Sequence, residues 1–207
     1  MLLERVSPHP SPSPSLEQYT IPASVAARIL WIIDREYGDI KGRRVLDFGC
    51  GTGRLAIGAA LLGASYVVGV DVDLTALKMA LVNAENLNVS GVVDFIYALI
   101  GEFNIHGDVV IQNPPFGVQR RRADRVFLEA AIKSAPIIYS LHKSGEGNRK
   151  FIFEFVDGLG GVVVDVIPLT LEIPHLFNFH YKRRHVVKVD LYRILAGGSA
   201  NPYKIYR

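Results

Sequence analysis

Four consecutive residues, Asn113, Pro114, Pro115 and Phe116, follow a short apolar run that predicts a buried strand at 109–112. Open α/β sheets bind their ligands at the carboxyl ends of such strands. The two prolines hold Asn113 extended and remove two N–H donors, so nearby carbonyl groups stay free to accept hydrogen bonds. The Asn113 side-chain oxygen and a proline carbonyl can take both hydrogens of a planar amine, and Phe116 offers a ring for stacking. These residues predict a site for an amino group on a conjugated ring or an amide.

A simple turn at the end of a strand would explain the same four letters equally well. A glycine-rich motif earlier in the chain favours the chemical interpretation. The sequence VLDFGCGTG at 45–53 places Asp47 and three alternating glycines, Gly49, Gly51 and Gly53, between an expected strand and an expected helix. Glycines there let the backbone approach a ligand at the positively polarised start of a helix. The third glycine comes one residue too early for a G-x-G-x-x-G loop, so no pyrophosphate site is implied.

Asp71 ends the next expected strand, 18 residues after Gly53. At about this spacing an acidic residue accepts hydrogen bonds from ribose hydroxyls. The pattern D-x-G-x-G-x-G resembles that of class I S-adenosylmethionine-dependent methyltransferases. The resemblance implies that the methionine part of the cofactor is held near Asp47, Gly49, Gly51, Thr52 and Gly53, with Asp71 at the ribose.

Together with Asn-Pro-Pro-Phe at the end of the fourth expected strand, the glycine motif resembles the amino-methyltransferases. These enzymes alkylate exocyclic amines of adenine or guanine, or a glutamine amide. The lone pair of an aryl amine is delocalised, so acceptors that hold its two hydrogens favour the pyramidal geometry needed to attack a sulfonium methyl group. No strong base is needed, because the proton can leave after the transfer.

Nearly the whole chain after its first residues is similar to one subgroup, the methyltransferase-like 5 family. Members of this family are adenine-N6 methyltransferases that act on small-subunit ribosomal RNA. The matching segments are LEQY at 16–19, AAR at 26–28, the glycine motif, NPPFG at 113–117, FL at 127–128, YSLHKS at 139–144, FH at 179–180 and VDL at 189–191. The resemblance implies that Gln18 contacts the cofactor.

The sequence departs from this family after the third expected strand. The family carries an acidic residue there for the adenine of the cofactor, whereas this chain reads Ala98-Leu99-Ile100-Gly101-Glu102. Either Glu102 substitutes for that residue, or backbone and apolar contacts hold the adenine.

Two other functions stay open. A protein glutamine N5-methyltransferase would use the same Asn-Pro-Pro chemistry, but such enzymes generally carry Tyr in place of Phe116 and a larger upstream domain. A non-catalytic RNA-binding scaffold is the second alternative, and the intact Asn113 and glycine motif argue against it. Cys50 has no paired base nearby in sequence, and no metal-ligand spacing is present. For His142 and Lys143, phosphate contact and a structural role are both possible.

Positive charge is clustered along this chain of 207 residues, whose formal net charge is +3 and whose sequence pI is about 9.0. A first basic cluster consists of Arg120, Arg121, Arg122 and Arg125. A second basic cluster consists of Lys182, Arg183, Arg184, His185 and Lys188. Two such clusters beside a candidate amine site predict a polyanionic partner such as structured RNA.

The sequence also favours a reducing compartment. The amino terminus has no basic-then-apolar leader pattern, and the longest apolar stretch, Ala56 to Val70, is interrupted and shorter than the roughly 20 residues of a membrane span. The single cysteine excludes an internal disulfide framework. We therefore expect a cytoplasmic protein without a membrane partner.

Alternating strands and helices from Arg43 onward predict an α/β protein with a doubly wound sheet. We expect a Rossmann-like class I methyltransferase fold, whose seven-stranded sheet is mostly parallel with an antiparallel last strand. Residues 1–15, rich in Ser and Pro, are expected to form a flexible tail, and residues 16–207 one domain. A first helix is expected from Pro22 to Gly38. The other expected helices are 54–62, 74–87, 124–134 and 147–159, and the expected strands are 45–48, 66–70, 92–98, 109–112, 137–141, 162–173 and 186–195.

The third expected strand, Val92 to Ala98, should lie at the sheet edge in the usual class I strand order. An apolar edge strand is an association hazard unless another chain covers it. The family resemblance implies a small zinc-binding activator subunit that adds a strand at this edge. We therefore expect a heterodimer, with Phe95 and Tyr97 as the positions at which to test it.

Overall fold

The computed structural model describes residues 2–12, 20–115, 123–174 and 184–197. Strands and helices alternate as the sequence predicts, and most boundaries agree within two residues. The helices are η1 (Leu2–Arg5), α1 (Ala23–Trp31), η3 (Ile32–Glu36), α2 (Arg54–Leu61), α3 (Leu74–Asn86), α4 (Ala123–Ser134) and α5 (Glu146–Gly158). The strands are β1 (Arg44–Phe48), β2 (Tyr66–Asp71), β3 (Val93–Tyr97), β4 (Val109–Gln112), β5 (Ile137–Lys143), β6 (Val162–Pro174) and β7 (Arg184–Leu195). No helix in these ranges is both long and apolar enough to span a membrane.

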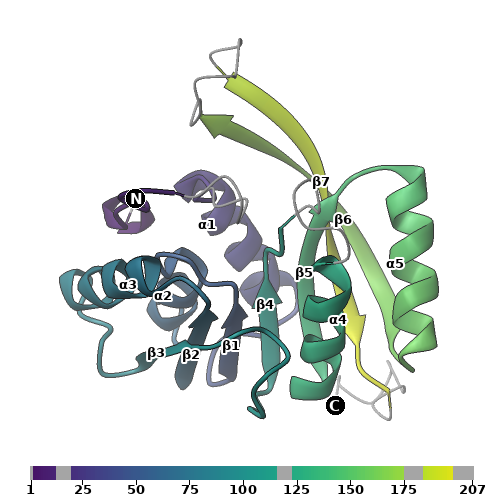
Figure 1. Ribbon diagram of the computed structural model, residues 1–207, viewed down its shortest axis with the longest axis horizontal. Coiled ribbons are helices and arrows are strands. Elements are labelled where there is room, and N and C mark those ends of the chain that lie inside the picture. Colours follow the sequence, from purple (N-terminus) through teal and green to yellow (C-terminus); the bar gives the residue numbers. More distant parts are fainter. Residues whose placement is uncertain (1, 13–19, 116–122, 175–183, 198–207) are drawn as a thin grey trace.

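The seven strands form one sheet in the order β3-β2-β1-β4-β5-β7-β6 (Figure 1). The first five strands in this order pair in parallel. The last of the described strands, β7, is antiparallel to both of its neighbours and separates β5 from β6. The predicted fold class is confirmed, including the antiparallel last strand and the edge position of β3.

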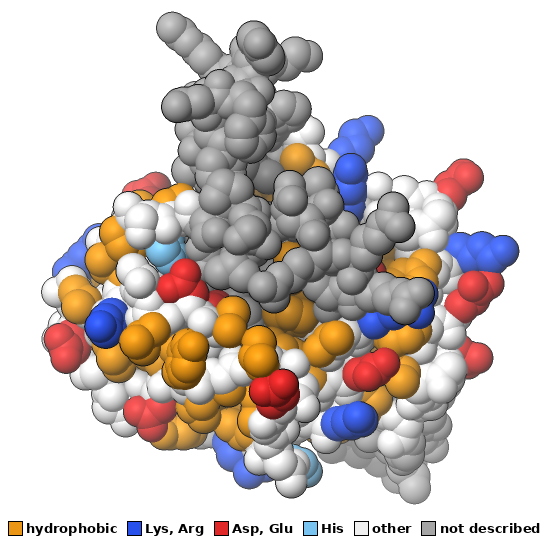
Figure 2. Space-filling view, viewed as in Figure 1, with side chains coloured by type: hydrophobic (Ala, Val, Ile, Leu, Met, Phe, Trp, Pro, Cys, Tyr) orange, Lys and Arg blue, Asp and Glu red, His pale blue; other side chains and the backbone are white. Residues whose placement is uncertain are grey.

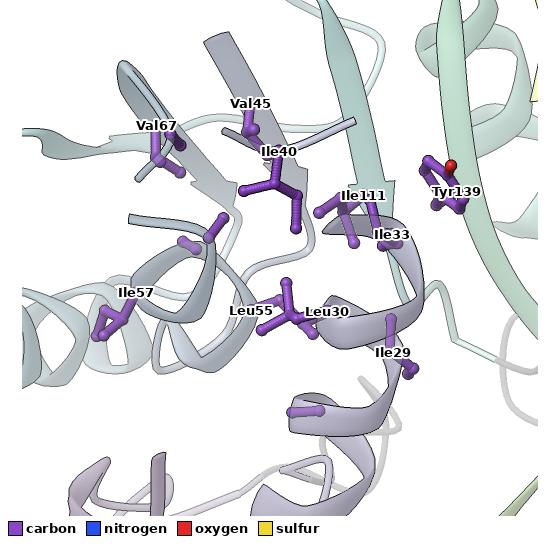
Figure 3. Packing of buried hydrophobic residues seen from close by; sticks show 14 of the residues in the cluster. Ile29, Leu30, Ile33, Ile40, Val45, Leu55, Ile57, Val67, Ile111 and Tyr139 are labelled. Atoms are coloured by element: carbon purple, nitrogen blue, oxygen red, sulfur yellow. The ribbon is translucent and has the colours of Figure 1, made fainter. Parts of the chain in front are cut away.

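Helices cover both faces of the sheet, which explains why β1, β4 and β5 are buried along nearly their whole length. On one face, η1, α1, η3 and α2 pack against residues such as Val45 and Ile111 (Figure 3). On the other face, α4 and α5 pack against residues such as Phe48 and Val110. The sheet is therefore the middle of three layers, with its carboxyl-terminal edge left for a site.

The amino-terminal residues differ from the expected flexible tail. Leu3 and Val6 are only 6% and 1% exposed and belong to the hydrophobic core. Leu3 packs beside Leu30 over Gly58, where an added Cβ would lie 2.2 Å from a Leu30 methyl. Two buried apolar side chains thus anchor a segment whose composition predicts solvation. Residues 13–15 of the expected tail lie outside the described residues.

The first helix continues from α1 into a wider π-helical stretch, η3, before Gly38 ends it with a φ of 67°. The residue that follows, Asp39, is buried and ties this helix to the distant part of the sheet. Its Oδ2 accepts hydrogen bonds from the Tyr139 hydroxyl at 2.6 Å and from Arg193 Nη2 at 3.0 Å. The helix is therefore fixed to β5 and β7 by a buried ion pair.

Strands β6 and β7 extend beyond the end of β5. The pairing of β5 with β7 stops at Lys143 and Val189, whereas β6 and β7 stay paired as far as Pro174 and Arg184. This two-stranded arm projects past the carboxyl ends of the parallel strands (Figure 1). It carries the described part of the second basic cluster.

Candidate functional site

The glycine motif forms a tight loop between β1 and α2. All three of its glycines have left-handed backbone angles, with φ of 71° at Gly49, 53° at Gly51 and 83° at Gly53. The N–H groups of Gly49 and Cys50 both donate to the Val70 carbonyl, at 2.8 and 3.1 Å, which turns the chain back over β2. Side chains are disfavoured in this conformation, so the loop presents bare backbone next to the start of α2.

Two carboxylates accept backbone N–H groups of this loop and of the helix that follows it. Asp47 Oδ2 accepts the Ala56 N–H at 2.9 Å, and Asp71 Oδ2 accepts the Gly51 N–H at 2.7 Å. Burial raises the pKa of Asp47 to about 7 and also raises that of Asp71. In the part of the chain that the structure describes, no Lys or Arg side chain pairs with either group. Asp47 thus acts on α2 through the backbone, whereas Asp71 lies at the edge of the loop and is partly exposed.

Thr52 supplies a buried hydroxyl that lacks a partner. Its Oγ1 makes no hydrogen bond with the described residues, although the side chain is only 4% exposed. A buried hydroxyl without a partner is costly, so a ligand atom at the loop would satisfy it. Bare backbone, this hydroxyl and the Asp71 carboxylate together fit the nucleoside cofactor expected from the sequence.

Asn113 lies beside the glycine loop because of strand register. In the pairing of β1 with β4, Phe48 is opposite Gln112. Gly49 and Asn113 therefore follow directly after the ends of two adjacent strands, and adjacent strands lie about 4.8 Å apart in a sheet. Asn113 and Pro115 are partly exposed and Pro114 is buried. The two motifs that the sequence singled out are brought together at one edge of the sheet.

A buried chain of hydrogen bonds lies directly behind Asn113 and was not predicted. Gln112 Nε2 donates to Ser140 Oγ at 2.9 Å, and Ser140 Oγ lies 2.6 Å from His142 Nε2. Burial lowers the pKa of His142 to about 4, so its ring is neutral at pH 7 and accepts the Ser140 hydroxyl proton. A buried, neutral His142 is a structural residue and not a phosphate ligand. The available signal in the sequence was the spacing of Ser140 and His142, which stand two residues apart on one strand.

Known proteins match either part of this chain or nearly all of it. A family model described as Ribosomal protein L11 methyltransferase (PrmA) matches residues 29–114. A Methanocaldococcus jannaschii protein, MJ0284, is 39% identical over 94% of this chain and 91% of its own length. The zebrafish (Danio rerio) protein named rRNA N6-adenosine-methyltransferase METTL5 is 33% identical over 92% of this chain and 94% of its own. This chain belongs to the methyltransferase-like 5 family.

A solved structure supports the same assignment. A Pyrococcus horikoshii protein, described as a candidate RNA methyltransferase, aligns with a TM-score of 0.87 at 36% identity and covers 96% of this chain and 94% of its own. The match to the L11 methyltransferase model stops at Pro114. It therefore covers the glycine loop and β4 but none of the strands β5 to β7. Membership of the methyltransferase-like 5 family, by contrast, rests on both halves of the sheet.

Several predicted site residues of this family member lie outside the described residues. These are Gln18, Phe116, Arg120, Arg121, Arg122, Lys182 and Arg183, and the side chain of Arg184 is not described either. Glu102 lies exposed on the loop after β3, next to Phe103, which packs edge-on against Phe48 at 5.3 Å. Its contact with a cofactor stays a prediction.

Two further observations concern metal binding and the reactivity of Cys50. In the described ranges, no three His, Cys, Asp or Glu side chains converge as metal ligands would. Burial raises the pKa of the Cys50 thiol well above its usual range, so this buried cysteine is a poor nucleophile.

Proposed function

We propose that this chain transfers a methyl group from S-adenosylmethionine to the N6 amine of an adenosine in structured RNA, with small-subunit ribosomal RNA as substrate. The observation that carries the proposal is the strand register that sets Gly49 of the loop beside Asn113. Membership of a family whose zebrafish member is named an rRNA N6-adenosine-methyltransferase supports the choice of substrate. The single, buried Cys50 supports a cytoplasmic location.

The chain's own residues position the amine. The Asn113 side-chain oxygen and the Pro114 carbonyl accept the two hydrogens of N6, so the nitrogen lone pair turns away from them and toward the glycine loop. Bound S-adenosylmethionine would supply the electrophilic methyl group on its sulfonium. The amine loses its extra proton to solvent after transfer, so Asn113 acts as an acceptor and not as a base. Phe116 is proposed to stack on the base, and Pro115 to keep this turn rigid.

The cofactor is proposed to lie along the loop between β1 and β2. Gly49, Gly51 and Gly53 would contact its methionine part, the Thr52 hydroxyl would gain a partner there, and Asp71 would accept from the ribose. Gln18 and Glu102 are proposed as further contacts from the amino-terminal side and from the loop after β3. Asp47 would act at a distance, by holding the start of α2.

Proteins are the leading alternative substrate, because an amide presents the same two hydrogens as an aryl amine. Its support is the L11 methyltransferase model, but that match ends before the half of the sheet formed by β5, β6 and β7. A non-catalytic RNA-binding scaffold is opposed by the intact loop and Asn113.

Side-by-side incubation of total RNA and total protein with tritiated S-adenosylmethionine, followed by nucleoside analysis, tests the proposal. Label in N6-methyladenosine is the expected result, and label confined to protein would contradict it. Asn113→Ala should lower the rate at least about 100-fold, by analogy with the loss of one positioned acceptor, while cofactor affinity stays near wild type. Asn104→Ala, an exposed change in the loop after β3, is the matched control.

RNA contacts are proposed for both basic clusters, with Arg120, Arg121 and Arg122 in the first and Lys182, Arg183 and Arg184 in the second. The described support is the position of Lys143 and Lys188, both exposed, where β5 ends and the arm begins. A buried adenosine must be unstacked to reach Asn113, which costs a few kcal/mol. Phosphate contacts at the arm and at the first cluster would offset this cost.

A protein partner is proposed at the β3 edge, where a small zinc-binding activator subunit would add a strand. Hydrophobic side chains gather over this edge (Figure 2). Ile96, Tyr97 and Leu99 are 40%, 62% and 45% exposed, and β3 pairs with β2 on one side alone among the described strands. Apolar, unpaired edges of this kind favour pairing with another chain.

Tyr97→Lys tests this interface by co-expression with such a subunit, and Trp31→Lys, an equally exposed change on α1, is its control. Loss of the complex in the first variant alone is expected. A wild-type chain that stays fully active and monomeric would contradict the proposal. Phe95 is unsuitable for this test, because its ring packs inward against Gly53 and Gly69 and its replacement would disturb the loop.

A further inference from the structure

The amino-terminal segment Leu2–His9, here named the strap, lies against the helices that flank the glycine loop. Leu3 and Val6 anchor it in the core. The guanidinium of Arg54, the first residue of α2, donates to the Val6 carbonyl through Nη2 at 2.7 Å. The strap therefore meets α2 directly after the last residue of the loop.

Asn83 joins the strap to the loop through a single side chain. Its Oδ1 accepts the Ser7 N–H at 3.0 Å, and its Nδ2 donates to the Ser7 carbonyl at 3.1 Å and to the Thr52 carbonyl at 3.0 Å. The side chain is fully buried in α3. Both amide hydrogens and the amide oxygen of Asn83 are thus used between the strap and the backbone of Thr52.

A second connection reaches the neighbouring loop residue from the other side. His9 Nε2 lies 3.1 Å from Asp73 Oδ2, and the Asp73 N–H donates to Asp71 Oδ1 at 2.9 Å. The other oxygen of Asp71 holds the Gly51 N–H. The two connections therefore end on consecutive residues of the loop, at the N–H of Gly51 and the carbonyl of Thr52.

Core packing does not explain this arrangement. An apolar side chain at position 83 would suit a buried helix position, whereas a buried amide is costly unless its hydrogen bonds are all made. Asn83 makes them with the strap and with the loop. Its chemistry is therefore specific for holding these two segments in one relative position.

We propose that the strap is a working part of the cofactor site, with Asn83 and Asp73 as positioning residues that fix the Thr52 carbonyl and, through Asp71, the Gly51 N–H. The inference rests on the proposed function, since it assumes that the cofactor binds at this loop. Cofactor affinity then depends on the strap, and by linkage the bound cofactor must stabilise the strap in return.

Hydrogen exchange on the wild-type chain tests the reciprocal effect without a mutation. Saturating S-adenosylhomocysteine should slow exchange in the peptide that covers residues 2–9 as well as in the peptide that covers the loop. Slower exchange in the loop with no change in the strap would overturn the inference. Failure of the wild-type chain to bind S-adenosylhomocysteine would instead contradict the proposed function.

Asn83→Leu removes all three hydrogen bonds with little change in side-chain shape, and Asn86→Leu, on the exposed side of the same helix, is its control. We expect the Kd for S-adenosylhomocysteine and the KM for S-adenosylmethionine to rise about tenfold in Asn83→Leu. The kcat at saturating cofactor should stay near wild type, which a partly unfolded enzyme would not show.

His9→Ala should weaken cofactor binding by a smaller factor, with His106→Ala, an exposed change, as its control. Unchanged affinity in a folded Asn83→Leu variant would overturn the inference.

Discussion

The two halves of the sheet treat their buried carboxylates differently. At β1 and β2, Asp47 and Asp71 accept hydrogen bonds from backbone N–H groups. In the other half, Asp190 of β7 is held by Arg149 at 2.8 and 2.9 Å, and Arg193 of β7 holds Asp39, which follows the first helix. Only the second kind of contact neutralises the carboxylate with a cation.

This difference matches the charges of the two proposed ligands. Carboxylates without a side-chain cation leave negative potential near the loop, which favours the positive sulfonium of S-adenosylmethionine. Pairing with arginine removes the negative potential of Asp190 and Asp39, which favours an anionic RNA at the β5 to β7 half. The sheet thus separates a region suited to a cation from a region suited to a polyanion.

The largest expected effect comes from breaking the arginine pairing. Arg193→Met leaves Asp39 buried without its cation, and their side chains are 11% and 1% exposed. The free energy of unfolding should fall by about 3 kcal/mol, measured by urea denaturation. Arg44→Met, which removes an exposed pair with Asp108, should change stability little. A similar loss in both variants would show that burial of the pair is unimportant.

A smaller but more specific effect is expected at the loop. Asp71→Ala removes both the proposed ribose acceptor and the partner of the Gly51 N–H, so affinity for S-adenosylhomocysteine should fall about 50-fold by calorimetry. Asp157→Ala, at an exposed position of α5, should bind as wild type does. Unchanged affinity in Asp71→Ala would remove Asp71 from the site.

Much of this architecture could be predicted from the sequence. Strands β1, β4 and β5 are buried on both faces, and their limits were predicted to within two residues. The position of Asp71 next to the loop could be predicted because its distance from the glycines reflects one helix and one strand of standard length. Where a candidate site residue stands at the end of a strand or helix, the local sequence pattern was sufficient to predict its position.

The residues that were missed depend on partners far away in sequence. Asn83 looks like an ordinary polar residue in a helix, and its bonds to Ser7 and Thr52 follow from tertiary packing. The contact between Gln112 and Ser140 requires the register of β4 and β5. Leu3 and Val6 are too few to show a periodic pattern, so their burial could not be predicted either.

The charge separation is tested on the RNA side by replacing Arg120, Arg121 and Arg122 with alanine. Each phosphate contact that is lost should reduce the slope of log affinity against log salt by about 0.7 to 0.9. Lys41→Ala with Arg43→Ala, exposed before the amino end of β1, should leave the slope unchanged. An unaltered slope in the triple variant would show that the first basic cluster does not contact RNA.

The smallest expected effect concerns pH. Because the pKa of Asp47 is raised to about 7, this carboxyl is mostly neutral at pH 6 and mostly ionised at pH 8. The preference for S-adenosylmethionine over uncharged S-adenosylhomocysteine should therefore rise a few-fold between these values, measured by calorimetry. Asp47→Asn should flatten this dependence. A constant preference in the wild-type chain would show that Asp47 does not sense the sulfonium.

The position of β7 between β5 and β6 has a consequence for biosynthesis. Among the described strands, β7 is the last to leave the ribosome. In the sheet, however, it lies between β5 and β6, and β6 pairs with β7. The nascent chain can therefore assemble β1 to β5 early, while β6 must wait for β7 before it joins the sheet. A chain terminated before Arg184 would leave β6 without its partner and the edge of β5 open to aggregation.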